Sequence, residues 1–373
     1  MRIAVVLFNL GGPDSPEAVR PFLRNLFTDP AILRMPAPLR AVLGRLIAWR
    51  RAPTARDVYA RIGGRSPLLP LTESQAEALE AALAREGATA RCFVAMRYWH
   101  PFAAATARAV REWGADRVLL LPLYPQYSTT TTGSSVTDWQ AAADRAGLDL
   151  PTTELCCWHS DPGFADATAA ILDRALAEAR AALPPGTALR LLFSAHGLPE
   201  PIVKAGDPYQ WQVEQSVAAV LRALDGRGTA APEHVVCYQS RVTPQRWIGP
   251  DTEAEVKRAA RDGVAVLVCP IAFVSEHSET LVELDIEYRE LGHRLGLPGY
   301  FRVPAQNSDP GFIEALARLA LRALDSGRPL CSFAGARQCP KRFGGCPHAA
   351  ARERAGAGDA AGRAAGIPEQ AAA

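Results

Sequence analysis

The sequence lacks several features that would place it in familiar classes of protein. No apolar run approaches the about 18 residues that a membrane-spanning helix needs. The run Ile3–Leu10 near the N-terminus is too short for a signal peptide and has no cleavage site. The net charge is only +2, so the totals carry no basic footprint of the kind found in nucleic-acid-binding proteins. These absences favour a cytoplasmic location and argue against a nucleic-acid partner.

Lysine and the common phosphate-binding motifs are also scarce. Only three of the 41 basic residues are lysine, and with the many alanines and prolines this indicates a coding bias rather than a function. Neither G-x-G-x-x-G nor G-x-x-x-x-G-K-[ST] occurs in the first half of the chain, so the loop Asn9–Pro13 indicates phosphate binding only weakly. The remaining composition, 48% hydrophobic and 21% charged, is ordinary and excludes a wholly disordered chain or a coiled coil.

Short apolar runs alternate with longer amphipathic stretches along the chain. This alternation predicts an α/β fold with parallel sheets. The two halves repeat one pattern, because a buried strand leads into Asn9–Pro13 in the first half and into Ser194–Pro199 in the second. We therefore predict two related doubly wound, Rossmann-like domains with an inter-domain cleft. The expected division is an N-terminal domain over 1–155, a C-terminal domain over 156–310, a helix and cysteine-containing segment over 311–347, and a disordered tail over 348–373.

His196 is a candidate for chemistry because it follows a predicted strand in a Ser-Ala-His-Gly-Leu-Pro loop. In open α/β sheets, ligands bind beyond the carboxyl ends of the strands, and an imidazole at such a position can accept a proton or bind a metal. The alternative is a histidine that only caps the following helix.

A second candidate is the acidic segment that follows the predicted strand Val264–Ile271. Its acidic residues Glu276, Glu279, Glu283 and Glu287 fall on one face of a helix, and a wider local turn would align the row further. Like charges at this spacing repel, so a cation path or carboxylates that exchange protons would explain the row. The alternative is a solvated acidic face paired with some of the many arginines.

The C-terminal cysteines form a third group. Cys331, Cys339 and Cys346 lie close together, with a spacing that does not match a zinc finger. Three thiolates predict an iron–sulfur cluster that needs a fourth ligand, for which Cys156 and Cys157 are candidates. The alternative for those two is a pair of buried, inert thiols.

The segment Pro36–Pro53 mixes large apolar residues, including Trp49, with four arginines. It predicts an amphipathic helix or lip at a membrane surface. A helix that faces a protein partner, or one that packs into the core, fits equally well.

Several longer motifs, taken together, resemble the ferrochelatase family. The stretch Leu191–Tyr209 fits the signature of that family throughout. The other matches follow in the family's order, within about residues 3–325: Phe8–Pro13, Tyr59–Leu68, Arg97–Pro101, Tyr124–Ser128, Gly249–Thr252 and Phe273–Tyr288.

The resemblance implies a lyase that inserts Fe²⁺ into protoporphyrin IX, the last step of haem biosynthesis. It implies that His196 and Glu279 take porphyrin protons or bind the metal, with Glu276, His277 and Glu283 beside them. Residues expected to line the porphyrin pocket are Leu10, Arg61, Tyr98, Tyr124 and Trp247. Two alternatives stay open: the same chemistry on coproporphyrin III, and a non-catalytic porphyrin or haem carrier.

The resemblance also bears on cofactors and partners. Some bacterial members carry a 2Fe–2S cluster on C-terminal cysteines, here Cys331, Cys339 and Cys346. Thr129 stands where animal relatives have a cluster cysteine, so the fourth ligand would differ. Enzymes of the preceding and following steps of the haem pathway are candidate partners, and Pro36–Pro53 would make peripheral contact with the inner face of the cell membrane.

Overall fold

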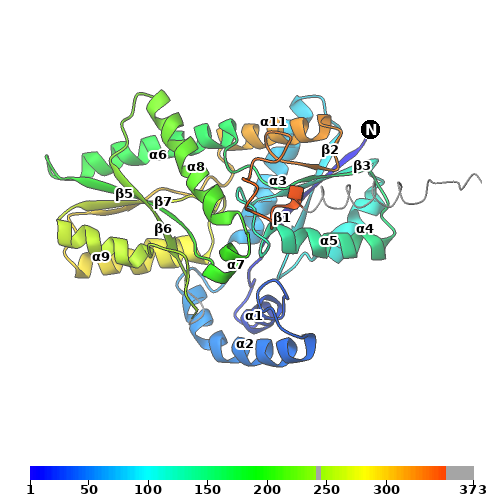
Figure 1. Ribbon diagram of the computed structural model, residues 1–373, viewed down its shortest axis with the longest axis horizontal. Helices are drawn as coiled ribbons and strands as arrows, with labels where there is room; N and C mark the ends of the chain where they lie inside the picture. Colours follow the sequence, from blue (N-terminus) through cyan, green and yellow to red (C-terminus); the bar gives the residue numbers. More distant parts are fainter. Residues whose placement is uncertain (241–244, 350–373) are drawn as a thin grey trace, which may run out of the picture.

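The computed structural model describes residues 1–240 and 245–349. Two parallel sheets lie side by side (Figure 1). The first has the order β2-β1-β3-β4-β9, and the second has the order β6-β5-β7-β8. The strands of the first sheet are β1 (Ile3–Asn9), β2 (Ala90–Met96), β3 (Arg117–Pro122), β4 (Thr152–Leu155) and β9 (Leu330–Cys331), and those of the second are β5 (Leu189–His196), β6 (Glu233–Gln239), β7 (Ala265–Pro270) and β8 (Tyr300–Arg302).

The strands are continuous apolar runs because helices cover both faces of each sheet. Every residue of β1 and β7 is buried. One hydrophobic cluster extends through both sheets, from Val5 and Leu119 in the first to Leu191 and Leu267 in the second. The predicted α/β fold with parallel sheets is confirmed.

The helices connect successive strands. They are α1 (Val19–Phe27), α2 (Ala37–Ala60), α3 (Leu68–Arg85), α4 (Ala103–Trp113), α5 (Thr132–Ala146), α6 (Pro162–Ala182), α7 (Glu200–Lys204), α8 (Tyr209–Gly226), α9 (Thr252–Asp262), α10 (Tyr288–Arg294) and α11 (Pro310–Asp325), together with the π-helix η1 (Glu279–Glu287).

Helices α6 and α11 begin with the same four residues, Asp-Pro-Gly-Phe. In each, the aspartate (Asp161 or Asp309) accepts hydrogen bonds from the two backbone N–H groups that follow the proline. Asp as N-cap and Pro in the first turn are a strong helix start. The two helices contact each other, and α11 also contacts α3, β3 and β4.

The C-terminal segment thus returns to the first sheet, where Cys331 of β9 pairs with Leu155 of β4. The predicted domain boundaries stay a prediction. The part of the predicted tail beyond residue 349 lies outside the described residues.

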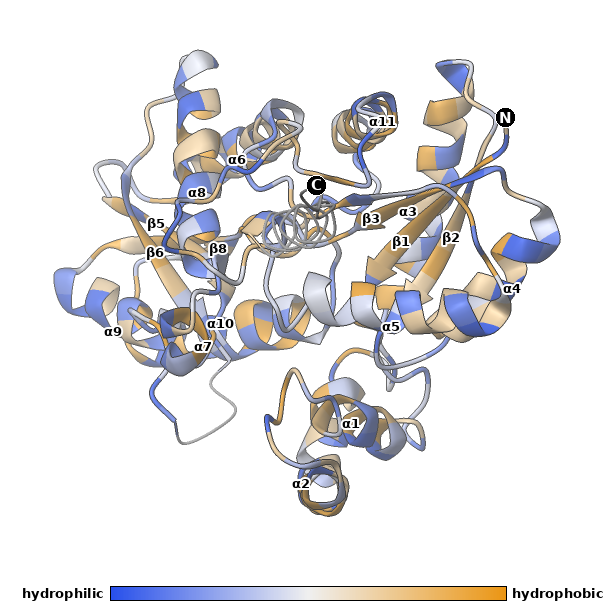
Figure 2. Ribbon diagram, turned by 45° about the vertical axis from the view of Figure 1, so that its right-hand side comes forward, coloured by the Kyte–Doolittle hydropathy of each residue, from blue (hydrophilic) through white to orange (hydrophobic). Residues whose placement is uncertain are grey.

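Helices α1 and α2 form a separate layer beside the two sheets (Figures 1 and 2). They cross closely at Gly44, where a Cβ atom would lie 2.6 Å from the carbonyl oxygen of Phe27. The predicted segment 36–53 forms the first part of α2, which continues to Ala60. Four of its large apolar side chains are exposed, namely Leu39, Val42, Leu46 and Trp49. In the described residues no helix is both long enough and apolar enough to cross a membrane.

Candidate active site

His196 is the last residue of β5, and neighbouring hydrogen bonds fix its position. The Ser194 hydroxyl lies 2.7 Å from the side-chain oxygen of Gln239, to which it donates, and 2.9 Å from the hydroxyl of Thr252. The backbone N–H of Gly197 donates to the carbonyl of Gln239 at 2.9 Å. The ends of β5 and β6 are thus held in register, and the imidazole stands at the strand end that the sequence predicts, with 31% of its side chain exposed.

Trp247 packs against this turn. Its ring meets the His196 ring edge-on, with 6.3 Å between the centroids. A Cβ atom at position 197 would lie 3.1 Å from the indole and 3.0 Å from the Gln239 carbonyl oxygen. Glycine at this position therefore allows the tryptophan to approach the histidine.

Glu276 precedes η1, and the rest of the acidic row lies in it. This segment forms a π-helix rather than an α-helix, which is the wider turn that the sequence suggested. Its first residue, Glu279, places Oε2 at 3.0 Å from His196 Nδ1 and 3.8 Å from His277 Nε2. π-helical turns are rare and frequently occur at functional sites. The structure thus brings together His196, His277 and Glu279 from two separate segments.

Glu283 lies one turn further along η1 and is held by donors from three positions. Its carboxylate accepts from the backbone N–H of Ser240 at 3.0 Å, from the Tyr288 hydroxyl at 2.8 Å and from the Gln239 amide at 3.3 Å. The Ser240 hydroxyl also donates to it. These donors leave Glu283 with a fixed orientation beside Glu279.

The two ends of the row differ from its middle, because arginines neutralise them. Glu276 forms a 2.8 Å ion pair with Arg302, and Glu287 forms a 3.4 Å ion pair with Arg61. The alternative of an acidic face paired with arginines therefore describes the two ends. In the middle, Glu279 contacts both histidines, and Glu283 beside it is held by Ser240, Tyr288 and Gln239.

The pKa values of the central groups are pushed apart. Burial lowers the pKa of His196, but the Glu279 carboxylate outweighs this effect and the net shift is upward. Burial acts to raise the pKa of Glu279, yet the histidine pair brings it to about 2. Burial and the Glu279 charge raise the pKa of Glu283, and burial lowers that of His277. Groups with such separated pKa values can divide proton acceptance and charge stabilisation among themselves.

The residues predicted to line a porphyrin pocket lie in different surroundings. Leu10 is half-buried where two hydrophobic clusters meet. Tyr98 and Tyr124 are buried, and the Tyr98 hydroxyl donates to Asp29 at 2.9 Å. Arg61, at the end of α2, also reaches Glu290 at 2.9 Å, so it joins the α1–α2 layer to the end of the acidic row. The substrate-binding roles of these residues stay predictions.

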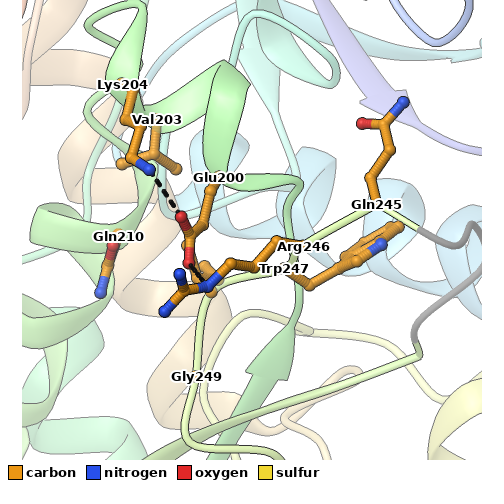
Figure 3. A pocket seen from close by; sticks show the side chains of 9 residues that line it. Glu200, Val203, Lys204, Gln210, Gln245, Arg246, Trp247 and Gly249 are labelled. Carbon is orange, nitrogen blue, oxygen red and sulfur yellow. Dashed lines mark hydrogen bonds and ion pairs between the residues drawn. The ribbon is translucent and has the colours of Figure 1, made fainter.

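A cavity of about 730 Å³ lies beside the turn that carries Trp247. Figure 3 shows the side chains that line it, from α7, α8 and the segment 245–249. Glu200 accepts from both Lys204 and Arg246 at 2.7 Å. One wall of the cavity is therefore formed by the ion pairs of Glu200, and another by Trp247, whose ring also contacts His196.

Five of the eight cysteines, namely Cys156, Cys157, Cys331, Cys339 and Cys346, lie in the region around the end of β4. Cys156 and Cys157 follow this strand, with 3.4 Å between their sulfur atoms. Gln212 donates to Cys339 at 3.1 Å, and Cys339 and Cys346 belong to one buried cluster. A hydrogen bond from Cys156 outweighs the effect of burial and lowers the pKa of Cys157 to about 6. Within the described ranges, however, no three Cys, His, Asp or Glu side chains are arranged as ligands of one metal ion.

Sequence reasoning missed some of the groups that hold the site. Arg302, which pairs with Glu276, lies beyond the acidic segment on β8, and no motif marks it. Ser240 carries a positive φ of 64°, a conformation that does not follow from its residue type. Both depend on how the second sheet and η1 pack, which local patterns do not encode.

Comparison with known proteins gives a consistent result. The family model described as Ferrochelatase matches residues 2–324. The ferrochelatase of Hyphomonas neptunium is 50% identical over 359 residues, which cover 95% of this chain and 97% of that protein. The ferrochelatase of Phenylobacterium zucineum is 52% identical over 351 residues, covering 93% and 98% respectively.

Among solved structures, the sirohydrochlorin chelatase SirB from Bacillus subtilis subspecies spizizenii in complex with cobalt aligns with a TM-score of 0.49 and 10% identity, over 87% of this chain and 97% of that one. The family model and the relatives match most of the chain. The chain belongs to the ferrochelatase family.

Proposed function

We propose that this protein inserts Fe²⁺ into protoporphyrin IX to give protohaem, with His196 and Glu279 as the central catalytic groups. The observation that carries the proposal is their 3.0 Å pair at the end of β5, beside the Glu283 carboxylate and His277. Ferrous iron and the porphyrin are the substrates, and the ferrochelatase relatives support this choice.

Metal insertion requires bases because the porphyrin must lose two N–H protons as the metal enters. His196 in its neutral form accepts a proton, and its partner Glu279 stabilises the charge that then develops on the imidazole. Glu283, whose pKa is raised, can take up a further proton. Imidazole and carboxylate are also suitable ligands for Fe²⁺ during its transfer, so His196 and Glu279 are the proposed metal contacts.

A turnover assay tests the proposal. Anaerobic protein is supplied with Fe²⁺ and either protoporphyrin IX or coproporphyrin III, and metalloporphyrin formation is followed spectroscopically. We expect faster turnover of protoporphyrin IX. Turnover of coproporphyrin III alone would overturn the choice of substrate. Tight haem binding without insertion of Fe²⁺ or Zn²⁺ would instead identify a carrier.

A 2Fe–2S cluster on Cys331, Cys339 and Cys346 is a separate proposal. Buried thiols suit such a cluster, and Cys157 lies in the same region as the C-terminal trio. The described side chains do not form a complete ligand set, so no step of metal insertion is assigned to the cluster.

We expect anaerobically purified protein to show visible charge-transfer bands that Cys339→Ser removes. The half-buried Cys92 lies outside the group, and Cys92→Ser, as the control, should keep the bands. A wild-type spectrum without these bands would refute the cluster, because thiolate-bound iron always absorbs in this range.

Contact with an anionic membrane surface is proposed for α2. The exposed side chains Leu39, Val42, Leu46 and Trp49 recur at helical spacing on one face, and Arg45 and Arg50 are exposed beside them. An amphipathic helix with apolar and basic side chains inserts into the headgroup region of anionic bilayers.

We expect the double variant Leu46→Ser/Trp49→Ser to reduce flotation with anionic liposomes at least fivefold. Leu295 is also exposed, at 42%, but lies after α10, and Leu295→Ser is the matched control. Equal flotation of the double variant and the wild type would exclude α2 as the contact. Self-association that disappears in the double variant would point to a second copy instead.

A further inference from the structure

Arg302, the last residue of β8, lies between two carboxylates of the acidic segment. Its side chain is only 10% exposed and donates to Glu276 at 2.8 Å and to Asp285 at 3.3 Å. One of these acids immediately precedes His277, and the other lies inside η1. The arginine therefore bridges two points of the chain that flank Glu279.

The two acids depend on Arg302 to different degrees. Asp285 has a second cation, because Arg289 reaches it at 2.5 Å. Glu276 accepts one further hydrogen bond, from the backbone N–H of Ala305 at 2.9 Å. Across residues 1–240 and 245–349, Arg302 is its only ion-pair partner and its second oxygen has no hydrogen-bond partner. Without Arg302, Glu276 would be a buried carboxylate with no compensating charge, which is strongly unfavourable.

Strand β8 also supports the unusual backbone of η1. The hydroxyl of Tyr300 donates to the Leu284 carbonyl at 2.5 Å, and Arg302 holds Asp285 next to it. A π-helix is rarely formed, so contacts from outside the helix must favour it here over an ordinary α-helix. The position of Glu279 at the start of η1, and hence its 3.0 Å contact with His196, follows from this support.

We propose that Arg302 is a positioning residue for metal insertion: by holding Glu276 and Asp285 it keeps η1 in the form that presents Glu279 to His196. It also neutralises the negative charge of Glu276, the first residue of the acidic row. Glu279 and Glu283 then remain as the acids that act on the substrates. This inference rests on the proposed function, although Arg302 itself touches neither His196 nor Glu279.

The test measures kcat and the two KM values, for metal and for porphyrin, in Arg302→Met and Arg302→Lys. We expect a loss in kcat of at least tenfold for Arg302→Met and a smaller loss for Arg302→Lys, which keeps the charge but cannot bridge both acids. The KM for porphyrin should stay within twofold, because the Arg302 side chain is only 10% exposed and its hydrogen bonds go to Glu276, Asp285 and the Val303 carbonyl. A parallel rise in the porphyrin KM would indicate general disruption and would overturn the proposal.

Measuring Arg302→Met again in a Glu276→Gln protein distinguishes a positioning role of Arg302 from a merely structural one. In Glu276→Gln the charge that Arg302 compensates is absent, so Arg302→Met should there reduce kcat by less than twofold. An equal loss in both backgrounds would contradict the proposal, since residues that act as a unit are not additive. If Arg302→Met does not fold, the same comparison is made with Arg302→Lys.

Arg318→Met is the matched control. Arg318 is an exposed arginine of α11 whose ion-pair partner is Glu314, so the kcat of this variant should stay within twofold of wild type. Wild-type turnover is measured in the same assay. Active wild type with unaffected Arg302 variants would refute the positioning role alone, whereas inactive wild type would refute the proposed function.

Discussion

Replacing His196 with alanine is expected to lower kcat for metal insertion by about 10²–10⁴-fold, the range that a positioned acid–base group contributes. The porphyrin can release its protons only as fast as a base accepts them, and His196 stands at the strand end with Glu279 held 3.0 Å away. Glu283 remains in the variant, but its carboxylate is turned toward Ser240 and Tyr288. We therefore expect it to compensate poorly.

The measurement is a stopped anaerobic assay of metalloporphyrin formation at saturating Fe²⁺. His293→Ala is the control, because His293 is an exposed histidine near the end of α10, and this variant should keep wild-type turnover. Thermal unfolding of both variants shows whether the fold is intact. Near-wild-type turnover of a folded His196→Ala protein would contradict the assigned role.

Features of this site that depend on neighbouring residues in the sequence could be predicted, whereas contacts between distant segments could not. The position of His196 followed from a buried strand that ends at a Gly/Pro loop, and the structure places it there. The shared face of the glutamates followed from their spacing. Which of them are neutralised did not, because Arg61 comes from the end of α2 and Arg302 from β8. Those pairings depend on the packing of segments that are distant in sequence.

The fold shows the same limit. The long apolar strands were predictable because burial on both faces requires continuous apolar residues. The start of α5, Thr132-Gly133-Ser134, carries no apolar pattern that would mark a helix. That start has poor helix propensity, and the helix is held by packing of Trp139 against Phe8. Strand β9 consists of two residues, too few to carry a periodic pattern.

The other large effect expected is that of Glu279→Gln, which keeps the size of the side chain and removes its charge. We expect kcat to fall by about 10²-fold, because the imidazolium that forms on proton transfer loses its counter-charge. His196→Ala/Glu279→Gln should be little worse than His196→Ala alone, since two groups that act as one unit lose their function together. Glu314→Gln, an exposed carboxylate on α11, should have no effect.

The pH profile of the same variant gives an independent result. His196 accepts a proton only when it is neutral, so kcat/KM falls as the pH drops through its pKa. In the wild type the Glu279 carboxylate, which outweighs the effect of burial, raises that pKa, and Glu279 itself, with a pKa of about 2, stays ionised across this range. Removal of the negative charge must therefore move the acid limb of kcat/KM to lower pH. A limb that stays in place would mean that the pair does not control the protonation of His196, and that the loss of kcat arises from metal binding by Glu279 instead.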